Sequence, residues 1–273
     1  MGRGEPPIRL GRDRPDGRLL SGSTVDVDRL HLLCAGDGQP TTFVWVLAVG
    51  QVLICPSILS ADFARLADDV DRVRPETDWL HVDVMDGHFV PNLTIGAPVV
   101  KSLRAHTDLF LDCHLMITDP KTYLPDFAKA GADQCSVHVE LGHSRDLIAQ
   151  CRDLGMRVGL VANPDAPFSS FAGFLGEIDT MLLMTVFPGF GGQSFMPEVV
   201  EKIAETAAEI ERLEAATVLQ VDGGISTTTA PACAWAGARA FVAGNAIFGA
   251  PDPLAAATAL RSAIVSSISD AES

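Results

Sequence analysis

Trp79–Asn92 reads WLHVDVMDGHFVPN, an apolar run that turns into a polar loop. The apolar half predicts a buried strand, on which successive side chains point to opposite faces. His81 and Asp83 are therefore expected on one face and Val82 on the other. Because a buried histidine and a buried carboxylate are costly without partners, this strand end predicts either a satisfied structural His/Asp pair or a binding site.

Length and composition narrow the class of protein. The chain has 273 residues, 47% of them hydrophobic, and a mean hydropathy of +0.23, which together predict a folded protein of one large or two modest domains. Its formal net charge is −15, which argues against a nucleic acid or an anionic membrane as a partner. An anionic substrate would have to be held by local devices such as backbone amides.

The cysteines indicate the redox compartment. None of the six has CxxC spacing, and three lie in apolar, strand-like runs. They are typical of small buried thiols in a reducing cytosol, and not of a disulfide framework or a zinc knuckle. We therefore expect a cytoplasmic protein. The cysteines are Cys34, Cys55, Cys113, Cys135, Cys151 and Cys233.

Residues 1–50 differ from the rest of the chain. They are rich in Gly, Arg, Asp and Pro and show no sustained period of 3.6 or 2, which predicts a poorly ordered extension. Residues 41–61 carry no charge, but prolines bracket this stretch and polar residues interrupt it, so it is not interpreted as a membrane span. A signal peptide also fits poorly. An over-extended gene start, with Val46 or Val49 as the true first residue, is a further hypothesis.

From residue 51 to 273 the chain alternates strands and helices. Eight apolar strands separated by amphipathic segments predict a parallel sheet covered on its outside. Eight such units in this length favour an α/β fold of the (β/α)8 TIM-barrel type over an open sheet, and no GxGxxG follows the first strand. The expected strands are 52–57, 79–84, 109–116, 133–140, 157–164, 180–186, 217–224 and 240–244, and the clearest expected helices are 96–105, 118–131, 197–215, 227–236 and 253–267.

Polar residues collect at the ends of these strands, where such a barrel carries its chemistry. Any one of them could be an ordinary hydrogen-bonded core residue, but several converging on one rim favour a site. His81, Asp83, His114 and Asp222 form a plausible N2O2 ligand set for one divalent cation, with Zn²⁺ or Fe²⁺ favoured and Mn²⁺ or Co²⁺ also suitable. His138 is left outside this set, as a core residue or a neighbour of the ligands.

Glycines follow the last three strands. Each could be an ordinary turn residue, but three adjacent glycine-containing loops favour a phosphate held by backbone amides. These residues are Gly189, Gly191 and Gly192, then Gly223 and Gly224, then Gly244 with Asn245.

The few lysines limit the chemistry. All four lie in expected helices, so no strand end offers a Schiff-base lysine, and the Asp-x-Lys-x-x-Asp arrangement of barrel decarboxylases is missing. Two carboxylates remain, which suits removal of a proton from one face of a substrate and delivery to the other. With a metal to stabilise an enediolate, this predicts an epimerisation beside a carbonyl. The lysines are Lys101, Lys121, Lys129 and Lys202.

Seven segments of the chain closely resemble the ribulose-phosphate 3-epimerase family. The resemblance covers essentially all of residues 52–260, and the first 50 residues lie outside it. It implies interconversion of D-ribulose 5-phosphate and D-xylulose 5-phosphate in the pentose phosphate or reductive pentose phosphate pathway. The segments are PSILSADFARL (56–66), HVDVMDGHFVPNLTIG (81–96), DCHLMI (112–117), VHVE (137–140), TVFPGFGGQSF (185–195), VDGGI (221–225) and VAGNAIFG (242–249).

The resemblance also implies roles for particular residues. Asp83 and Asp222 would be the acid/base pair and metal ligands, with His81 and His114 completing the metal site. Ser57 would contact substrate oxygen, and Met85 and Met116 would cap the enediolate, which the residues alone would not have indicated. The substrate-binding set is Ser57, Met85, His114, Met116, Gly189, Gly191, Gly192, Asp222, Gly223, Gly224, Gly244 and Asn245.

The chain departs from the family pattern at two positions. Asn245 stands where Ser or Thr is usual, which puts one phosphate contact in doubt, and Phe187 replaces a polar residue before the Pro-Gly-Phe turn. Two alternatives stay open: a 3-epimerase of a six-carbon ketose phosphate such as D-allulose 6-phosphate, and a non-catalytic phosphosugar-binding barrel. A homo-oligomer, dimer or hexamer, is expected from the resemblance.

Overall fold

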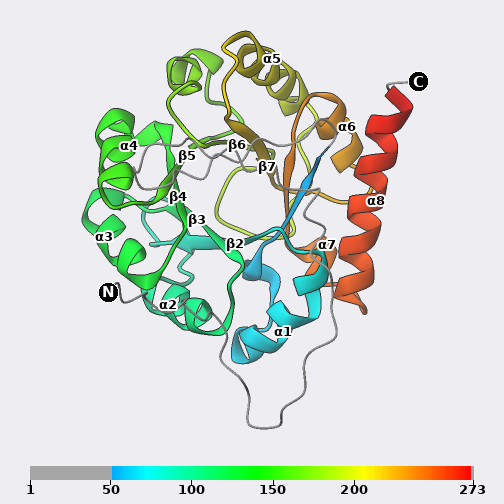
Figure 1. Cartoon of the computed structure of the whole chain (residues 1–273), viewed down its shortest axis with the longest axis horizontal. Helices are drawn as coiled ribbons and strands as arrows, with labels where there is room; N and C mark the ends of the chain where they lie inside the picture. The colour runs from blue at the N-terminus through cyan, green and yellow to red at the C-terminus, as the bar shows by residue number, and fades with distance from the viewer. Residues whose placement is uncertain (1–50, 272–273) are drawn as a thin grey trace, which may run out of the picture. The chain divides into compact units, whose positions relative to one another are not determined.

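The computed structural model describes residues 51–271, and these form a barrel of eight parallel strands surrounded by helices (Figure 1). The predicted α/β TIM-barrel class is therefore confirmed. The predictions made for residues 1–50 lie outside the described residues. The strands are β1 (Leu53–Pro56), β2 (Trp79–Met85), β3 (Phe110–Met116), β4 (Gln134–His138), β5 (Arg157–Ala162), β6 (Thr180–Met184), β7 (Val218–Asp222) and β8 (Ala240–Ala243).

Helices cover the outside of the strands (Figure 1). Their ends follow ordinary capping rules: Asp119 accepts a hydrogen bond from Thr122 N at the start of α3, and Gly131 ends that helix with a left-handed φ of 91°. The helices are α1 (Leu66–Val73), α2 (Ala97–His106), α3 (Pro120–Ala130), α4 (Ser144–Asp153), α5 (Val199–Arg212), α6 (Ala230–Trp235), α7 (Asn245–Phe248) and α8 (Pro253–Ala271).

Strand order around the sheet is β1-β8-β7-β6-β5-β4-β3-β2, and every paired neighbour is parallel. Within residues 51–271, no continuous ladder of backbone hydrogen bonds joins β1 to β2. There, one parallel bridge joins Ser57 to His81. We call this β1–β2 boundary the seam. It matters for the site because residues proposed for function lie on both sides of it.

The barrel interior is layered. Trp79 and Phe110 pack at the base with ring centroids 4.9 Å apart. Above them lies a buried polar layer centred on Asp112, and the expected site residues of β2 follow at the open end. Val82 belongs instead to the apolar core between strands and helices, as the predicted alternation requires.

The strands expected for 157–164, 180–186 and 217–224 end earlier, at Ala162, Met184 and Asp222. Two further expectations are corrected. The strand predicted for 133–140 ends at His138, because Val139–Leu141 form a 3-10 turn that Gly142 closes at φ 77°. The short helix α7 after β8 was not expected, since only a final helix from residue 253 was predicted. Both differences fall at strand ends, next to the site. No helix within residues 51–271 has the length and apolar character needed to cross a membrane.

Candidate active site

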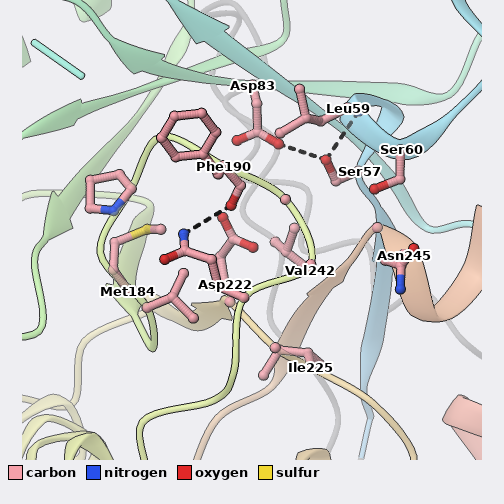
Figure 2. A pocket seen from close by; sticks show the side chains of 18 of the residues that line it. Ser57, Leu59, Ser60, Asp83, Met184, Phe190, Asp222, Ile225, Val242 and Asn245 are labelled. Carbon is pink, nitrogen blue, oxygen red and sulfur yellow. Dashed lines mark hydrogen bonds between the residues drawn. The ribbon is translucent and has the colours of Figure 1, made fainter. Parts of the chain in front are cut away.

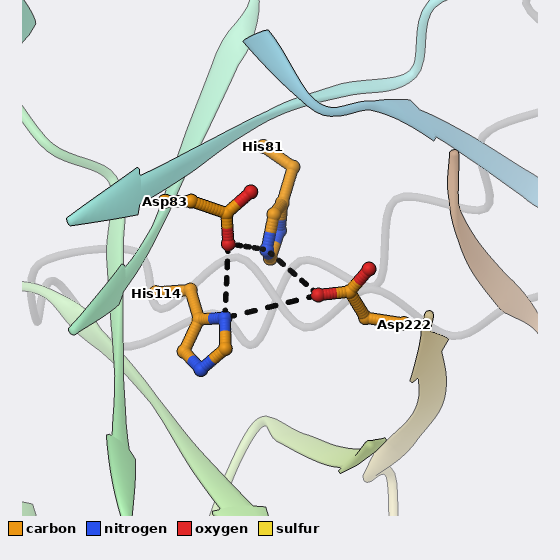
Figure 3. A group of neighbouring side chains, drawn as sticks. All are labelled: His81, Asp83, His114 and Asp222. Carbon is orange, nitrogen blue, oxygen red and sulfur yellow. Dashed lines mark hydrogen bonds and ion pairs between the residues drawn. The ribbon is translucent and has the colours of Figure 1, made fainter. Parts of the chain in front are cut away.

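Four side chains meet at the open end of the barrel, from three strands (Figure 3). His81 and Asp83 come from β2, His114 from β3 and Asp222 from β7. His81 Nε2 lies 3.4 Å from Asp83 Oδ1 and 4.0 Å from Asp222 Oδ2. His114 Nδ1 lies 3.2 Å from Asp83 Oδ1 and 3.9 Å from Asp222 Oδ2. One ligand atom from each residue falls within 4.8 Å of the others.

This arrangement fits a divalent cation. Ligand atoms about 2.0–2.1 Å from a tetrahedral zinc ion would be separated by about 3.3 Å, close to the shorter distances observed here. His81 Nε2 is buried, makes no hydrogen bond and faces the other three ligand atoms. Such an atom is costly unless something else occupies the space in front of it. Imidazole nitrogens and carboxylate oxygens suit first-row divalent metals.

The two carboxyl groups have opposite pKa shifts. Burial by itself would raise the pKa of Asp83, but the facing His81 and the hydrogen bond with His114 hold it well below its usual range. Burial and the negative charge of Asp83 raise the pKa of Asp222 to about 7. In the metal-free protein, Asp83 is therefore ionised near neutral pH, whereas Asp222 is about half protonated there and mainly protonated at lower pH. A pair separated in this way can divide the roles of base and acid.

The two imidazoles also differ. Burial would lower the pKa of His81, but Asp83 and Asp112 raise it well above its ordinary value. Burial lowers the pKa of His114, and the hydrogen bond to Asp83 does not offset this. A metal at this position would thus replace the proton of His81, whereas His114 offers a neutral nitrogen without losing one.

Ser57 contacts the site from the other side of the seam. Its Oγ donates to Asp83 Oδ2 at 2.6 Å and accepts from Leu59 N, which starts the 3-10 turn after β1. These bonds fix the second oxygen of Asp83, so that Oδ1 is the one that faces His81 and His114.

A cavity of about 370 Å³ opens above these residues (Figure 2). His81 and His114 do not line it, because both side chains are fully buried beneath. The cavity brings together the rest of the predicted set and adds residues that were not predicted, among them Ser60, Phe190 and Ser226. The predicted residues on its wall are Ser57, Asp83, Met85, Met116, Gly189, Gly191, Gly192, Asp222, Gly223, Gly224, Gly244 and Asn245.

Close steric contacts explain why glycine occupies two positions on this wall. Gly224 has φ +63°, and a Cβ there would lie 2.6 Å from the backbone nitrogen of Phe195. A Cβ on Gly244 would lie 2.6 Å from Ser60 Oγ. A side chain is excluded at Gly224 by backbone and crowded at Gly244 by the Ser60 hydroxyl, so glycine keeps backbone amides close to the cavity wall at both positions.

Of the two departures from the family pattern, Asn245 lies on the cavity wall and Phe187 does not. Asn245 lines it at the start of α7, and Phe187 is 48% exposed in the loop after β6. Gln193 Nε2 donates to the carbonyl oxygens of Phe187 and Phe190, at 2.7 and 2.9 Å. Backbone acceptors therefore define this loop, and the Phe187 side chain makes none of these bonds.

Further polar side chains lie behind the two imidazoles. Asp112 Oδ2 is 2.8 Å from His81 Nδ1 and also accepts from Gln220 Nε2 at 2.9 Å. His138 Nε2 is 2.9 Å from His114 Nε2, and His138 Nδ1 is 3.0 Å from Glu140 Oε2. Burial lowers the pKa of His138 to about 4, so this ring is neutral at physiological pH. The sequence alone assigned no role to Asp112 or Glu140. Asp112 lies two residues before His114 and Glu140 two residues after His138, and this spacing was the available signal that each could contact a histidine.

Comparison with known proteins gives a consistent result. A family model described as the ribulose-phosphate 3 epimerase family matches residues 53–248. The ribulose-phosphate 3-epimerase of Mycobacterium tuberculosis is 48% identical over 219 residues, covering 78% of this chain and 93% of that protein. The enzyme of that name from Bacillus subtilis is 44% identical, over 77% of this chain and 99% of its own length. The cytoplasmic isoform from Oryza sativa is 45% identical, over 80% and 96%.

Solved structures with lower identity share the fold. KGPDC from Streptococcus mutans superposes with a TM-score of 0.62 at 17% identity, covering 79% of this chain and 97% of that one. Orotidine 5′-phosphate decarboxylase from Pyrococcus horikoshii gives 0.60 at 20% identity, over 78% and 99%. At these identities the likeness supports the barrel architecture alone.

Proposed function

The chain belongs to the ribulose-phosphate 3-epimerase family and is an isomerase, and from this premise we propose that Asp83 and Asp222 move the proton at C3 of a phosphorylated pentulose. The substrates are D-ribulose 5-phosphate and D-xylulose 5-phosphate, which differ in configuration at that carbon. The six-carbon alternative is not favoured, because the relatives compared above carry the ribulose-phosphate name.

One observation carries the proposal: two carboxyl groups with opposed pKa shifts face one another at the mouth of the barrel (Figure 3). The Asp83 carboxylate takes the proton from C3 on one face of the substrate. The electron pair left on carbon is delocalised into the neighbouring carbonyl as an enediolate. The Asp222 carboxyl then donates its proton to the opposite face of C3, which inverts the centre.

Other residues hold the substrate around this carbon. The glycine-containing loops after β6, β7 and β8 present backbone amides to the phosphate, and Ser57 contacts oxygens of the substrate. Met85 and Met116 lie together in one apolar cluster at the cavity and exclude water from the enediolate. A net charge of −15 favours this local mode of anion binding.

His81, Asp83, His114 and Asp222 would hold the metal ion. When bound, a divalent cation supplies positive charge beside the developing enediolate oxygens. Zn²⁺ and Fe²⁺ are the preferred candidates, and Mn²⁺ and Co²⁺ suit the same donor set. We further propose a homo-oligomer, dimer or hexamer, and a cytoplasmic location, the latter supported by the rice isoform; light scattering after gel filtration tests the oligomer.

The test is deuterium incorporation at C3 in D₂O. Wild-type protein loaded with Co²⁺ should interconvert the two pentulose phosphates and place deuterium at C3 of the product. Asp83→Asn and Asp222→Asn should each lose epimerisation while retaining C3 exchange with one epimer, a different epimer for each variant. Asp108→Asn is the control, because Asp108 is exposed and pairs with Arg74 away from the site.

Metal content measured on each sample separates lost proton transfer from lost metal. Full epimerase activity in either site variant would refute the two-carboxylate assignment. Absence of exchange by the metal-loaded wild type would refute the substrate assignment.

A further inference from the structure

A line of three side chains runs from the metal site to the outside of the barrel. His114 Nδ1 faces Asp83 and Asp222, and its Nε2 lies 2.9 Å from His138 Nε2. On the far side of that ring, His138 Nδ1 lies 3.0 Å from Glu140 Oε2. The two rings are stacked, with centroids 5.1 Å apart. Both imidazoles are buried, whereas the Glu140 side chain is 28% exposed.

Hydrogen bonding permits one arrangement of protons along this line when a metal is bound. A metal-binding nitrogen carries no proton, so the proton of neutral His114 is on Nε2. That Nε2–H points at His138 Nε2, which must accept it. The proton of His138 is then on Nδ1, where it is donated to the Glu140 carboxylate. With the opposite tautomer of His138, two N–H groups would face each other at 2.9 Å.

We propose that Glu140 is a positioning residue, which acts through His138 to hold His114 in the tautomer that offers Nδ1 to the metal. The inference rests on the metal site proposed above and goes beyond it, because neither His138 nor Glu140 touches the metal or the substrate. A carboxylate behind a ligating imidazole fixes its ring and tautomer and raises its basicity. Here the carboxylate acts through an intervening ring.

The surroundings hold Glu140 in this position. The 3-10 turn Val139–Leu141 directs its side chain back along β4, and its second oxygen accepts a hydrogen bond from Asn163 N at 2.7 Å. Phe89 packs on the His138 ring, with centroids 4.6 Å apart. Both oxygens of Glu140 thus face N–H donors, a requirement that an ionised carboxylate meets and an amide does not.

His81, the other proposed imidazole ligand, is also backed by a carboxylate, but without an intervening ring. His81 Nδ1 lies 2.8 Å from the buried Asp112 carboxylate, so His81 Nε2 is the nitrogen left to face the metal. His114 has no carboxylate at its outer nitrogen; His138 occupies that place and extends the contact to Glu140. Each imidazole of the site is therefore backed by one carboxylate.

The experiment measures Co²⁺ binding to metal-depleted protein, by the d–d absorption of the bound ion and by competition with a chelator. Glu140→Gln keeps the shape of the side chain but must turn its NH₂ toward either His138 Nδ1 or Asn163 N. We expect its Co²⁺ affinity to fall 10- to 100-fold, the usual effect of removing such a partner. Glu177→Gln is the matched control, since the Glu177 carboxylate pairs with Arg145 on the surface and this variant should bind Co²⁺ as wild type does.

A double-mutant comparison separates positioning from general support of the loop. In a His138→Gln background, Glu140→Gln should cause no further loss of Co²⁺ affinity, because its effect passes through His138. Additive losses in the double variant would overturn the proposal. Thermal unfolding of each metal-free variant establishes that it is folded at the temperature of the titration.

His114→Ala distinguishes failure of this inference from failure of the metal site. If His114→Ala binds Co²⁺ at least 100-fold more weakly and Glu140→Gln stays within twofold of wild type, the role proposed for Glu140 is wrong and the metal site stands. If His114→Ala binds Co²⁺ as wild type does, the metal site itself is wrong, and the role of Glu140 is wrong with it.

Discussion

Replacing Arg261 by methionine should weaken the barrel at its seam. Arg261 lies on α8, and its guanidinium donates to Glu76 Oε2 at 2.8 Å and to Asp78 Oδ2 at 2.7 Å. It also donates to the carbonyl oxygens of Val52 and Glu76. Asp78 in turn joins the two unladdered strands, since its Oδ2 accepts from Ile54 N at 2.8 Å and its backbone N donates to Ile54 O at 3.0 Å.

The magnitude follows from burial. Breaking one partner out of a fully buried ion pair costs about 3–5 kcal/mol, and exposed pairs contribute about 0–1 kcal/mol. The side chains of Arg261, Glu76 and Asp78 are 20%, 24% and 30% exposed, so water can partly solvate the groups left behind. We therefore expect Arg261→Met to lower the free energy of unfolding by about 2–3 kcal/mol. For a domain of this size, that corresponds to a midpoint temperature of thermal unfolding lower by roughly 5–10 °C.

Guanidinium unfolding of the metal-free protein gives the free energy, and epimerase activity at 25 °C gives the state of the site. Arg212→Met is the control, because Arg212 is 66% exposed and pairs with Glu209 on the same helix; its effect should stay within about 0.5 kcal/mol. Activity of the folded Arg261→Met protein should equal that of wild type. A destabilisation no larger than that of the control would refute the role assigned to Arg261.

Three other predictions concern the site. Gly224→Ala should raise KM for the pentulose phosphate at least tenfold with a smaller change in kcat, because its Cβ would meet the backbone of Phe195, whereas Gly155→Ala shares the positive φ without a close neighbour and should leave KM unchanged. Asp86 accepts bonds from the loop after β3, which lower its pKa from 3.8 to about 2; the stability difference between wild type and Asp86→Asn should be complete above pH 4 and shrink as pH falls toward 2, in urea titrations. Co²⁺ affinity should rise with pH, because binding removes the proton that Asp83 and Asp112 stabilise on His81, and calorimetry in two buffers should register that release.

The alternation along β2 was predictable from sequence because it needs only the geometry of one strand. Val82 packs outward, while His81 and Asp83 point into the barrel. Convergence of the strand ends also followed from the fold class, since every parallel strand ends at the same rim. These two rules are sufficient to predict that His81, Asp83 and His114 lie close together.

Partners of these residues could not be predicted in the same way, because they depend on register. In the structure, β2 and β3 pair His81 with Asp112 and Asp83 with His114, and both pairs are also joined by side-chain hydrogen bonds. A shift by one residue would have placed other side chains opposite them. The single-strand pattern of DCHLMI shows Asp112 two residues before His114 but not which imidazole it contacts.

The position of Glu140 was hidden for a related reason. Residues 133–140 alternate like a strand to the end, and a strand would have carried Glu140 along the barrel wall. The chain instead leaves the sheet after His138, and the turn closed by Gly142 returns the carboxylate to the preceding histidine. Local sequence propensity does not predict this turn, because a hydrogen bond from Asn163 N, on the loop after β5, stabilises it.

Charge balance at the mouth of the barrel is consistent with the proposed site, which has no lysine. In the metal-free protein below about pH 7, the pKa shifts make Asp83 and Asp112 negative, His81 positive and Asp222 mainly neutral, a sum of about −1. A divalent cation that displaced the proton of His81 and left the acid Asp222 protonated would bring this sum to about 0. The cation would thus neutralise the charge buried in the barrel and add no unpaired charge there. Because the cation would bring the positive charge, the proposed site would let a strongly acidic chain stabilise an anionic intermediate among carboxylates.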